Sequence, residues 1–172
     1  MRWRGTCYRA HDPRWAYQPL SGEGAALRGG RFNVKGQAAL YLSLSILGAV
    51  KEVNQGLVRR IDPCILCAYD IDCENIVDLR GARGRKEHGA TLADMRCAWI
   101  ILRAEGHDPP SWALARRLAA GGHAGMLVPS FAPGAGADDH NLVLWRWSDA
   151  PPHRVSVHDP GGRLPKDPSS WR

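Results

Sequence analysis

The sequence predicts an α+β fold, and three observations carry this prediction. Segments with strand patterning and segments with helical periodicity are both plentiful along the 172 residues. The two kinds of segment do not alternate strictly, as they would in a doubly wound parallel sheet. The last third of the chain, from Met126 onward, is mostly strand-like. We therefore expect a mixed sheet core with flanking helices.

The first half of the chain contains the earlier predicted strands and a long predicted loop. Runs of aromatic and β-branched residues, bounded by turn-forming residues, predict the strands. Residues 14–35 show no clear period and are rich in glycine, and loops of this length in compact domains are usually functional or mobile. The predicted strands are Trp3–Ala10, Ala39–Ser43, Cys64–Ile71 and Asn75–Leu79.

One amphipathic helix is predicted in this half, capped by Ser45 and running to about Arg60. Its apolar residues recur at helical spacing and define the stripe expected to face the core. At about 100° per residue, Glu52 lies roughly 120° from the centre of that stripe, on the flank of the helix. There it faces either a cleft or water, which is the usual environment of a helical glutamate. The predicted stripe is Ile46, Val50, Val53 and Leu57.

Two further helices are predicted in the second half. Thr91 begins the first, and Asp94 follows at the spacing of a capping box. The second covers Ser111–Ala120, entered from Pro109-Pro110 and ended by Gly121-Gly122. The apolar face of the first is Leu92, Met95, Trp99 and Leu102.

The remaining segments complete the predicted domain. Residues 80–89 are expected to be a loop, and the proline- and glycine-rich chain after Asp159 is expected to be irregular. We expect a single catalytic domain over 1–158 and a tail over 159–172. The closing strands are Met126–Phe131, Asn141–Trp147 and Arg154–His158.

Composition and charge narrow the classes of function. The formal net charge is +6 and the sequence pI is about 9.4, so a polyanionic ligand must be considered. The arginines are scattered, and the densest basic stretch, residues 80–86, is short and glycine-rich. A nucleic-acid-binding or RNA-cleaving protein would be expected to show a basic stripe or an aromatic RNA-binding motif, and neither is present.

The sequence also predicts a compartment and the state of the cysteines. Charged residues interrupt the start of the chain, and no segment reaches 18 consecutive apolar residues, so we expect a cytoplasmic protein that does not enter a membrane. The odd number of cysteines agrees with a reducing compartment. Cys64 and Cys67 lie in an apolar run and are expected to be buried strand thiols, and no metal site is expected.

Common nucleotide and hydrolase motifs are absent. Gly22-x-Gly24 is not followed by the third glycine of a dinucleotide-binding fingerprint, and no G-K-[ST] occurs. The chain also lacks H-E-x-x-H and G-x-S-x-G, the motifs of zinc proteases and α/β hydrolases.

The run from Leu27 to Glu52 contains G-G-R-F-N-x-x-G, then a short strand with tyrosine, then a helix with glutamate. With this motif, the run resembles the core of the RES-domain family of bacterial toxins, which are encoded beside an antitoxin. The resemblance implies a fold like that of ADP-ribosyltransferases of the diphtheria-toxin type, with NAD as the consumed substrate and no metal. It extends over nearly the full length, through Cys7–Ala10, Val128–Phe131 and Asn141–Trp145.

The resemblance also implies site residues, and their chemistry suits NAD. Arg31 offers a planar fork for the diphosphate, and the ring of Tyr41 can stack on the cationic nicotinamide. Glu52 can stabilise the positive charge that develops on ribose as nicotinamide leaves. The resemblance places Ser130 in the NAD site as well, and Arg9 by a weaker correspondence.

Each of these residues also has an ordinary structural explanation. Arg31 can close a glycine-rich turn, Tyr41 can pack in the core, and Ser130 can form a turn after Pro129. Taken together at these spacings, they are better explained by a site. His140 and His158 lie near strand ends, where structural roles are favoured over catalytic ones.

The expected function is therefore that of a toxin which cleaves the nicotinamide–ribose bond of NAD. Transfer of ADP-ribose to a cellular protein ranks first among the outcomes, and release to water or phosphate follows closely. A cognate antitoxin is expected to cover the Arg31 and Glu52 site, with nucleic acid contacted only through that antitoxin. The alternatives from other classes are an RNA-binding or RNA-cleaving toxin and a non-catalytic interaction module.

Overall fold

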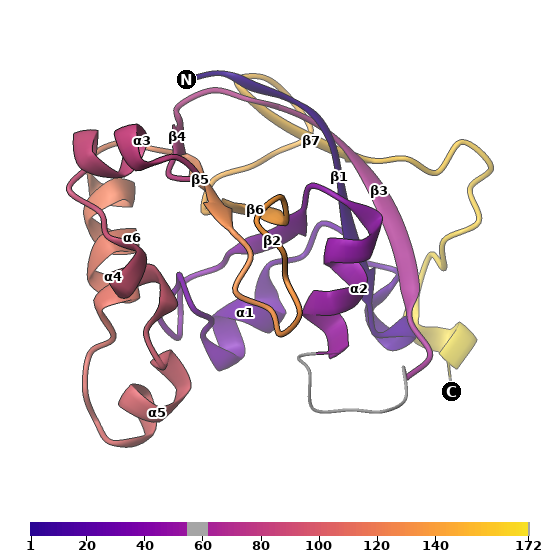
Figure 1. Ribbon diagram of the computed structural model, residues 1–172. Helices are drawn as coiled ribbons and strands as arrows, with labels where there is room; N and C mark the ends of the chain where they lie inside the picture. The colour runs from indigo at the N-terminus through magenta and orange to yellow at the C-terminus, as the bar shows by residue number, and fades with distance from the viewer. Residues whose placement is uncertain (55–61, 172) are drawn as a thin grey trace.

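A seven-stranded sheet forms the centre of the computed structural model, which describes residues 1–54 and 62–171 (Figure 1). The strand order is β4-β5-β6-β2-β1-β3-β7. Neighbouring strands run antiparallel except β4 and β5, which are parallel. This mixed sheet with flanking helices confirms the predicted fold class. The strands are β1 (Trp3–His11), β2 (Leu40–Ser43), β3 (Ile65–Cys73), β4 (Ile76–Asp78), β5 (Gly125–Pro129), β6 (His140–Leu144) and β7 (His153–Val157).

The helices gather in two places around this sheet. α3 to α6 lie together near β4 and β5, whereas α2 lies over β1 and β2 (Figure 1). None of the described helices is both long and apolar enough to cross a membrane. The helices are α1 (Glu23–Arg28), α2 (Ile46–Asn54), α3 (Ala82–Glu87), α4 (Leu92–Arg96), α5 (Trp99–Ala104) and α6 (Pro110–Ala120), with short 3-10 turns η1 (Pro13–Trp15) and η2 (Pro168–Trp171).

Two segments predicted as loops contain short helices. The six-residue helix α1 lies inside the predicted loop 14–35, and its last carbonyl, at Arg28, accepts a hydrogen bond from Arg103. The six-residue helix α3 lies inside the predicted loop 80–89. A Cβ on Gly84 would lie 1.9 Å from the Asp78 carbonyl oxygen, so glycine is required for α3 to pack against β4. Both helices depend on tertiary contacts, which hydrophobic periodicity does not report.

The predicted helix from Thr91 is divided in two. Its capping box is confirmed, since the Thr91 and Asp94 side chains and backbone N–H groups bond reciprocally. However, α4 ends at Arg96, and Cys97 adopts an extended conformation before α5 begins. Met95 is fully buried as expected, but Leu92 is 41% exposed, so the predicted continuous apolar face is wrong. The helix over Ser111–Ala120 is confirmed as α6.

The orientation of α2 differs from the prediction. Ile46 and Val53 of the predicted buried stripe are 49% and 40% exposed, whereas Ala49 is 3% exposed and Gly48 is buried. Leu57 and the predicted helix end at Arg60 lie outside the described residues. Small residues therefore form the face of α2 that packs on the sheet, because they let the helix approach closely.

Two core clusters lie on the two faces of the sheet, as strand alternation requires. On the helix-covered face, Met126, Val143 and Tyr41 pack with residues of α4 and α6. On the opposite face, Leu20, Trp147 and Leu164 come from loops and the C-terminal tail. That opposite cluster includes Cys7, Leu40, Leu42, Cys67, Tyr69, Ile71, Leu142 and Val155.

The cysteines agree in part with their prediction. Cys67 is 6% exposed within β3, as expected of a buried strand thiol, whereas Cys64 is half-buried and precedes that strand. Both are free thiols.

A buried histidine predicts how stability depends on pH. His11 is 5% exposed and hydrogen-bonded to the Tyr69 hydroxyl. Burial, with a smaller contribution from the Arg9 charge, lowers the pKa of His11 from 6.5 to about 4. Between these values the unfolded chain binds the proton more readily, so the free energy of unfolding should fall as pH falls. The largest loss is on the order of 3 kcal/mol.

We predict that His11→Gln flattens this pH dependence, because the amide can keep a polar contact with Tyr69 but does not titrate. Urea unfolding between pH 7.5 and 4.5 measures the effect, and exposed His107→Gln is the matched control. Equal slopes for His11→Gln and the wild-type protein would contradict the prediction.

Candidate functional site

The Glu52 carboxylate is held by donors from two other elements. Glu52 Oε1 accepts one hydrogen bond from Ser130 Oγ at 2.7 Å and one from Asn141 Nδ2 at 2.6 Å. Ser130 follows β5 directly, and Asn141 lies in β6. Both partners donate, which is the arrangement a charged carboxylate requires because it can only accept.

The close packing of α2 brings Glu52 to this position. Gly48, Ala49 and Glu52 are spaced three and four residues apart and share the inward face of the helix. A Cβ on Gly48 would lie 3.3 Å from Ser43 Cβ, so little space separates the helix from β2. The sequence prediction that Glu52 lies on the helix flank followed from the wrong buried stripe. Glu52 faces the sheet instead.

Asn141 and Ser43 were not anticipated as part of the site. Ser43 Oγ donates to Asn141 Oδ1 at 2.9 Å, and the two residues are register partners across β2 and β6. Strand alternation could have identified them, because both lie two residues from Tyr41 or Val143 on the helix-covered face. Polar residues at inward strand positions are the signal that was missed.

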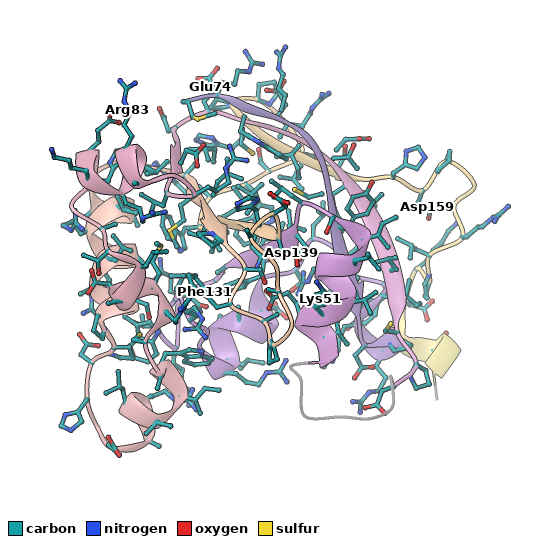
Figure 2. The ribbon with its side chains drawn as sticks, in the orientation of Figure 1. Lys51, Glu74, Arg83, Phe131, Asp139 and Asp159 are labelled. Carbon is teal, nitrogen blue, oxygen red and sulfur yellow. The ribbon has the colours of Figure 1, made fainter. Side chains whose placement is uncertain are left out.

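The loop after Ser130 is attached to α2 through an ion pair. Lys51 Nζ lies 2.7 Å from Asp139 Oδ2, and Figure 2 shows the two side chains meeting beside α2. The same carboxylate accepts the Gly136 N–H, and the Asp139 carbonyl accepts the Ser130 N–H at 2.7 Å. The Lys51 side chain, with the Gly136 N–H, holds the pKa of Asp139 below its usual range. These contacts fix the backbone of Ser130 next to Glu52.

Tyr41 lies on the same face of the sheet as Glu52, and its hydroxyl is hydrogen-bonded to the preceding loop. Its hydroxyl donates to Asn33 Oδ1 at 2.7 Å and accepts the Phe32 N–H at 2.9 Å. Burial raises the pKa of Tyr41, and the Glu52 charge contributes in the same direction. A Cβ on Gly30 would lie 2.6 Å from the Tyr41 hydroxyl oxygen, so this glycine allows the loop to pack there.

Arg31 connects the glycine-rich loop to the end of α4. Its Nη1 donates to the carbonyls of Cys97 at 2.8 Å and Met95 at 3.1 Å. Its Cζ lies 5.2 Å from the ring centroid of Phe131, a residue that sequence reasoning did not identify. Figure 2 places Phe131 between the α4–α6 group and α2.

Electrostatics tie Arg31 to the other predicted site residues. Burial lowers the pKa of Arg31, and Cys97, Glu52 and Tyr41 oppose that shift in decreasing order. Arg31, Tyr41 and Glu52 are therefore within electrostatic reach of one another. Both hydrogen bonds found for Arg31 leave from Nη1, so its other N–H groups have no partner among the described residues.

The structure does not bring Arg9 into this group. Tyr8 is the register partner of Ser43, so Arg9 projects from the opposite face of β1. Its Nη1 donates to the carbonyls of Ser21 at 3.3 Å and Pro19 at 3.5 Å. Burial lowers the pKa of Arg9.

Other surface features lie away from Glu52. One shallow depression of about 610 Å³ lies over β1, β3 and β7, and another of about 410 Å³ lies beside Trp145 and Trp147. His158 is 63% exposed and 4.0 Å from Asp70, and His140 is paired in register with Pro129. Among the described residues, no three His, Cys, Asp or Glu side chains are grouped so that they could hold a metal ion.

Comparisons with known proteins agree with this architecture. A search of curated proteins finds no match. A chain from the crystal structure of the M. tuberculosis MbcT-MbcA toxin-antitoxin complex is similar, with 24% identity and a TM-score of 0.60, over 92% of this chain and 84% of that one. The profile of the RES domain matches residues 6–167. The chain belongs to the RES domain family.

Proposed function

We propose that this protein cleaves NAD at the bond between ribose and nicotinamide, at the Glu52 site. One observation carries the proposal: the Glu52 carboxylate is held on the helix-covered face by Ser130 and Asn141, within electrostatic reach of Arg31. An oriented carboxylate beside an arginine suits a substrate that develops positive charge on a sugar and carries a diphosphate. Membership of the RES family supports the choice of NAD.

In the proposed reaction, the glycosidic C–N bond breaks and nicotinamide leaves with the bonding electron pair as a neutral molecule. Positive charge then develops on the ribose, and Glu52 stabilises it without forming a bond. Arg31 contacts a phosphate of NAD through the N–H groups that do not bind Met95 and Cys97. The ring of Tyr41 holds the nicotinamide by stacking.

The acceptor completes the reaction by bonding to the ribose carbon and losing a proton. We rank a side chain of a cellular protein first, which makes the enzyme an ADP-ribosyltransferase. Water or inorganic phosphate gives a glycohydrolase or a phosphorylase instead. Incubation with NAD alone, with phosphate and with a cell lysate, followed by identification of the products, separates the three outcomes.

We predict that Glu52→Gln lowers nicotinamide release by about 100-fold or more while sparing NAD binding. The amide oxygen can still accept from Ser130 and Asn141, but the negative charge is lost. Exposed Glu105→Gln is the control for removal of a carboxylate. Release within threefold of wild type would exclude Glu52 as the stabilising carboxylate.

We predict that Arg31→Lys weakens NAD binding at least tenfold, since a lysine cannot bind two carbonyls, stack on Phe131 and contact a diphosphate together. Calorimetry with NAD measures the affinity. Arg83→Lys is the matched control, because the Arg83 side chain is 92% exposed. Unchanged affinity in Arg31→Lys would leave Arg31 with only its contacts to α4.

We also propose that a cognate antitoxin covers the Glu52 site in the cytoplasm and that any contact with nucleic acid is made by the antitoxin. The similar chain comes from a toxin–antitoxin complex, and the net charge of +6 favours an acidic partner segment. The partners, purified separately and mixed, should lose both nicotinamide release and NAD binding. A complex that binds NAD at full affinity would show that inhibition acts without covering the site.

A further inference from the structure

We propose that Asn141 is a positioning residue that fixes the orientation of the Glu52 carboxylate, so that one oxygen is held against the sheet and the other faces the substrate, with Ser43 holding the Asn141 amide from its other end. The inference rests on the proposed function of Glu52, and it assigns a role to two residues of the sheet beneath it. Three contacts carry it: Ser43 to Asn141, Asn141 to Glu52, and Ser130 to Glu52.

Asn141 is held rigidly by the sheet. Asn141 lies in β6 between two strands, in register with Ser43 of β2 and Val128 of β5. Ser43 is 2% exposed, so its hydroxyl has little access to water. A side chain on a paired central strand is held more accurately than one on a loop. Asn141 therefore offers Glu52 a fixed donor.

The Asn141 amide lies between Glu52 and Ser43 in one defined orientation. An asparagine side chain has a donating end and an accepting end, and only the donating end can meet a carboxylate favourably. Ser43 Oγ lies 2.9 Å from Asn141 Oδ1 and donates its single proton there. The reversed amide would turn Oδ1 against the Glu52 carboxylate, which can only accept, whereas the Ser43 hydroxyl can accept from Nδ2 as well as donate to Oδ1. Glu52 therefore sets the orientation of the amide, and Ser43 holds its accepting end.

The two oxygens of the Glu52 carboxylate differ in their contacts. Asn141 Nδ2 and Ser130 Oγ both donate to Oε1 of Glu52. The Ala132 N–H donates to Ser130 Oγ, which leaves the Ser130 proton directed at Glu52. With Oε1 turned toward the sheet and engaged twice, Oε2 is the oxygen presented to the ribose.

The test compares purified full-length variants in nicotinamide release from NAD. Asn141→Ala should lower kcat by about tenfold to 100-fold with the KM for NAD within threefold, since positioning acts on the reacting state. Asn141→Asp should lose more, because a second carboxylate then faces Glu52. Ser43→Ala should lose less than Asn141→Ala. Exposed Ser156→Ala on β7 is the control.

A second comparison separates positioning from general structural support. In a Glu52→Gln background, Asn141→Ala should cause no further loss of the residual rate, because both changes remove the same effect. A loss of equal size in both backgrounds would overturn the inference. A raised KM with unchanged kcat in Asn141→Ala would also overturn it.

A third measurement does not need activity. Shifts in the urea midpoint for Asn141→Ala and Glu52→Ala should be non-additive in the double variant, and additive shifts would overturn the inference. If the wild-type protein released no nicotinamide with any acceptor, the proposed function would fail instead. The two failures are therefore distinguishable.

Discussion

The close approach of α2 to the sheet is the constraint on which the site depends. A Cβ on Gly48 would lie 3.0 Å from Ser45 Oγ and 3.3 Å from Ser43 Cβ, so a larger residue would push the helix outward. A hydrogen bond to a carboxylate weakens once its atoms separate by a few tenths of an ångström beyond contact. The contacts of Glu52 with Ser130 and Asn141 therefore require the small-residue face of this helix.

Turning a glutamate toward the sheet has an energetic cost that the surrounding groups offset. A partly buried carboxylate loses hydration, and it is tolerated only with donors or an opposite charge nearby. Ser130 and Asn141 supply the donors, and Arg31 supplies the charge. Arg31 also binds the carbonyls of Met95 and Cys97, so the end of α4 is tied to the same site. The division of the predicted helix at Cys97 is part of this arrangement.

The sequence predicted the features of this fold that depend on neighbouring residues. The strands, the Thr91 capping box and the start of α6 each have a local signal, and each is confirmed. The face of α2 was predicted wrongly, because periodicity counts apolar residues and does not register how closely Gly48 lets the helix approach. The same limit applies to the site. Strand alternation could have marked Asn141 as an inward polar residue, but its contact with Glu52 depends on the pairing of β2 with β6, which no local pattern reports. Arg9 shows the importance of strand register, since a single position moves a side chain to the other face.

The distribution of the arginines bears on which kind of ligand the basic charge serves. Arg2, Arg80 and Arg116 pair with aspartates, and Arg85 and Arg117 donate to backbone carbonyls. These five arginines bind groups of the protein itself and stabilise loops and helix ends. They do not form the continuous basic stripe that follows a nucleic-acid backbone. Arg31 differs because it lies near Glu52 and because its Nε and Nη2 groups have no hydrogen-bond partner among the described residues. This contrast supports the proposed diphosphate ligand at one place over a long polyanion spread across the surface.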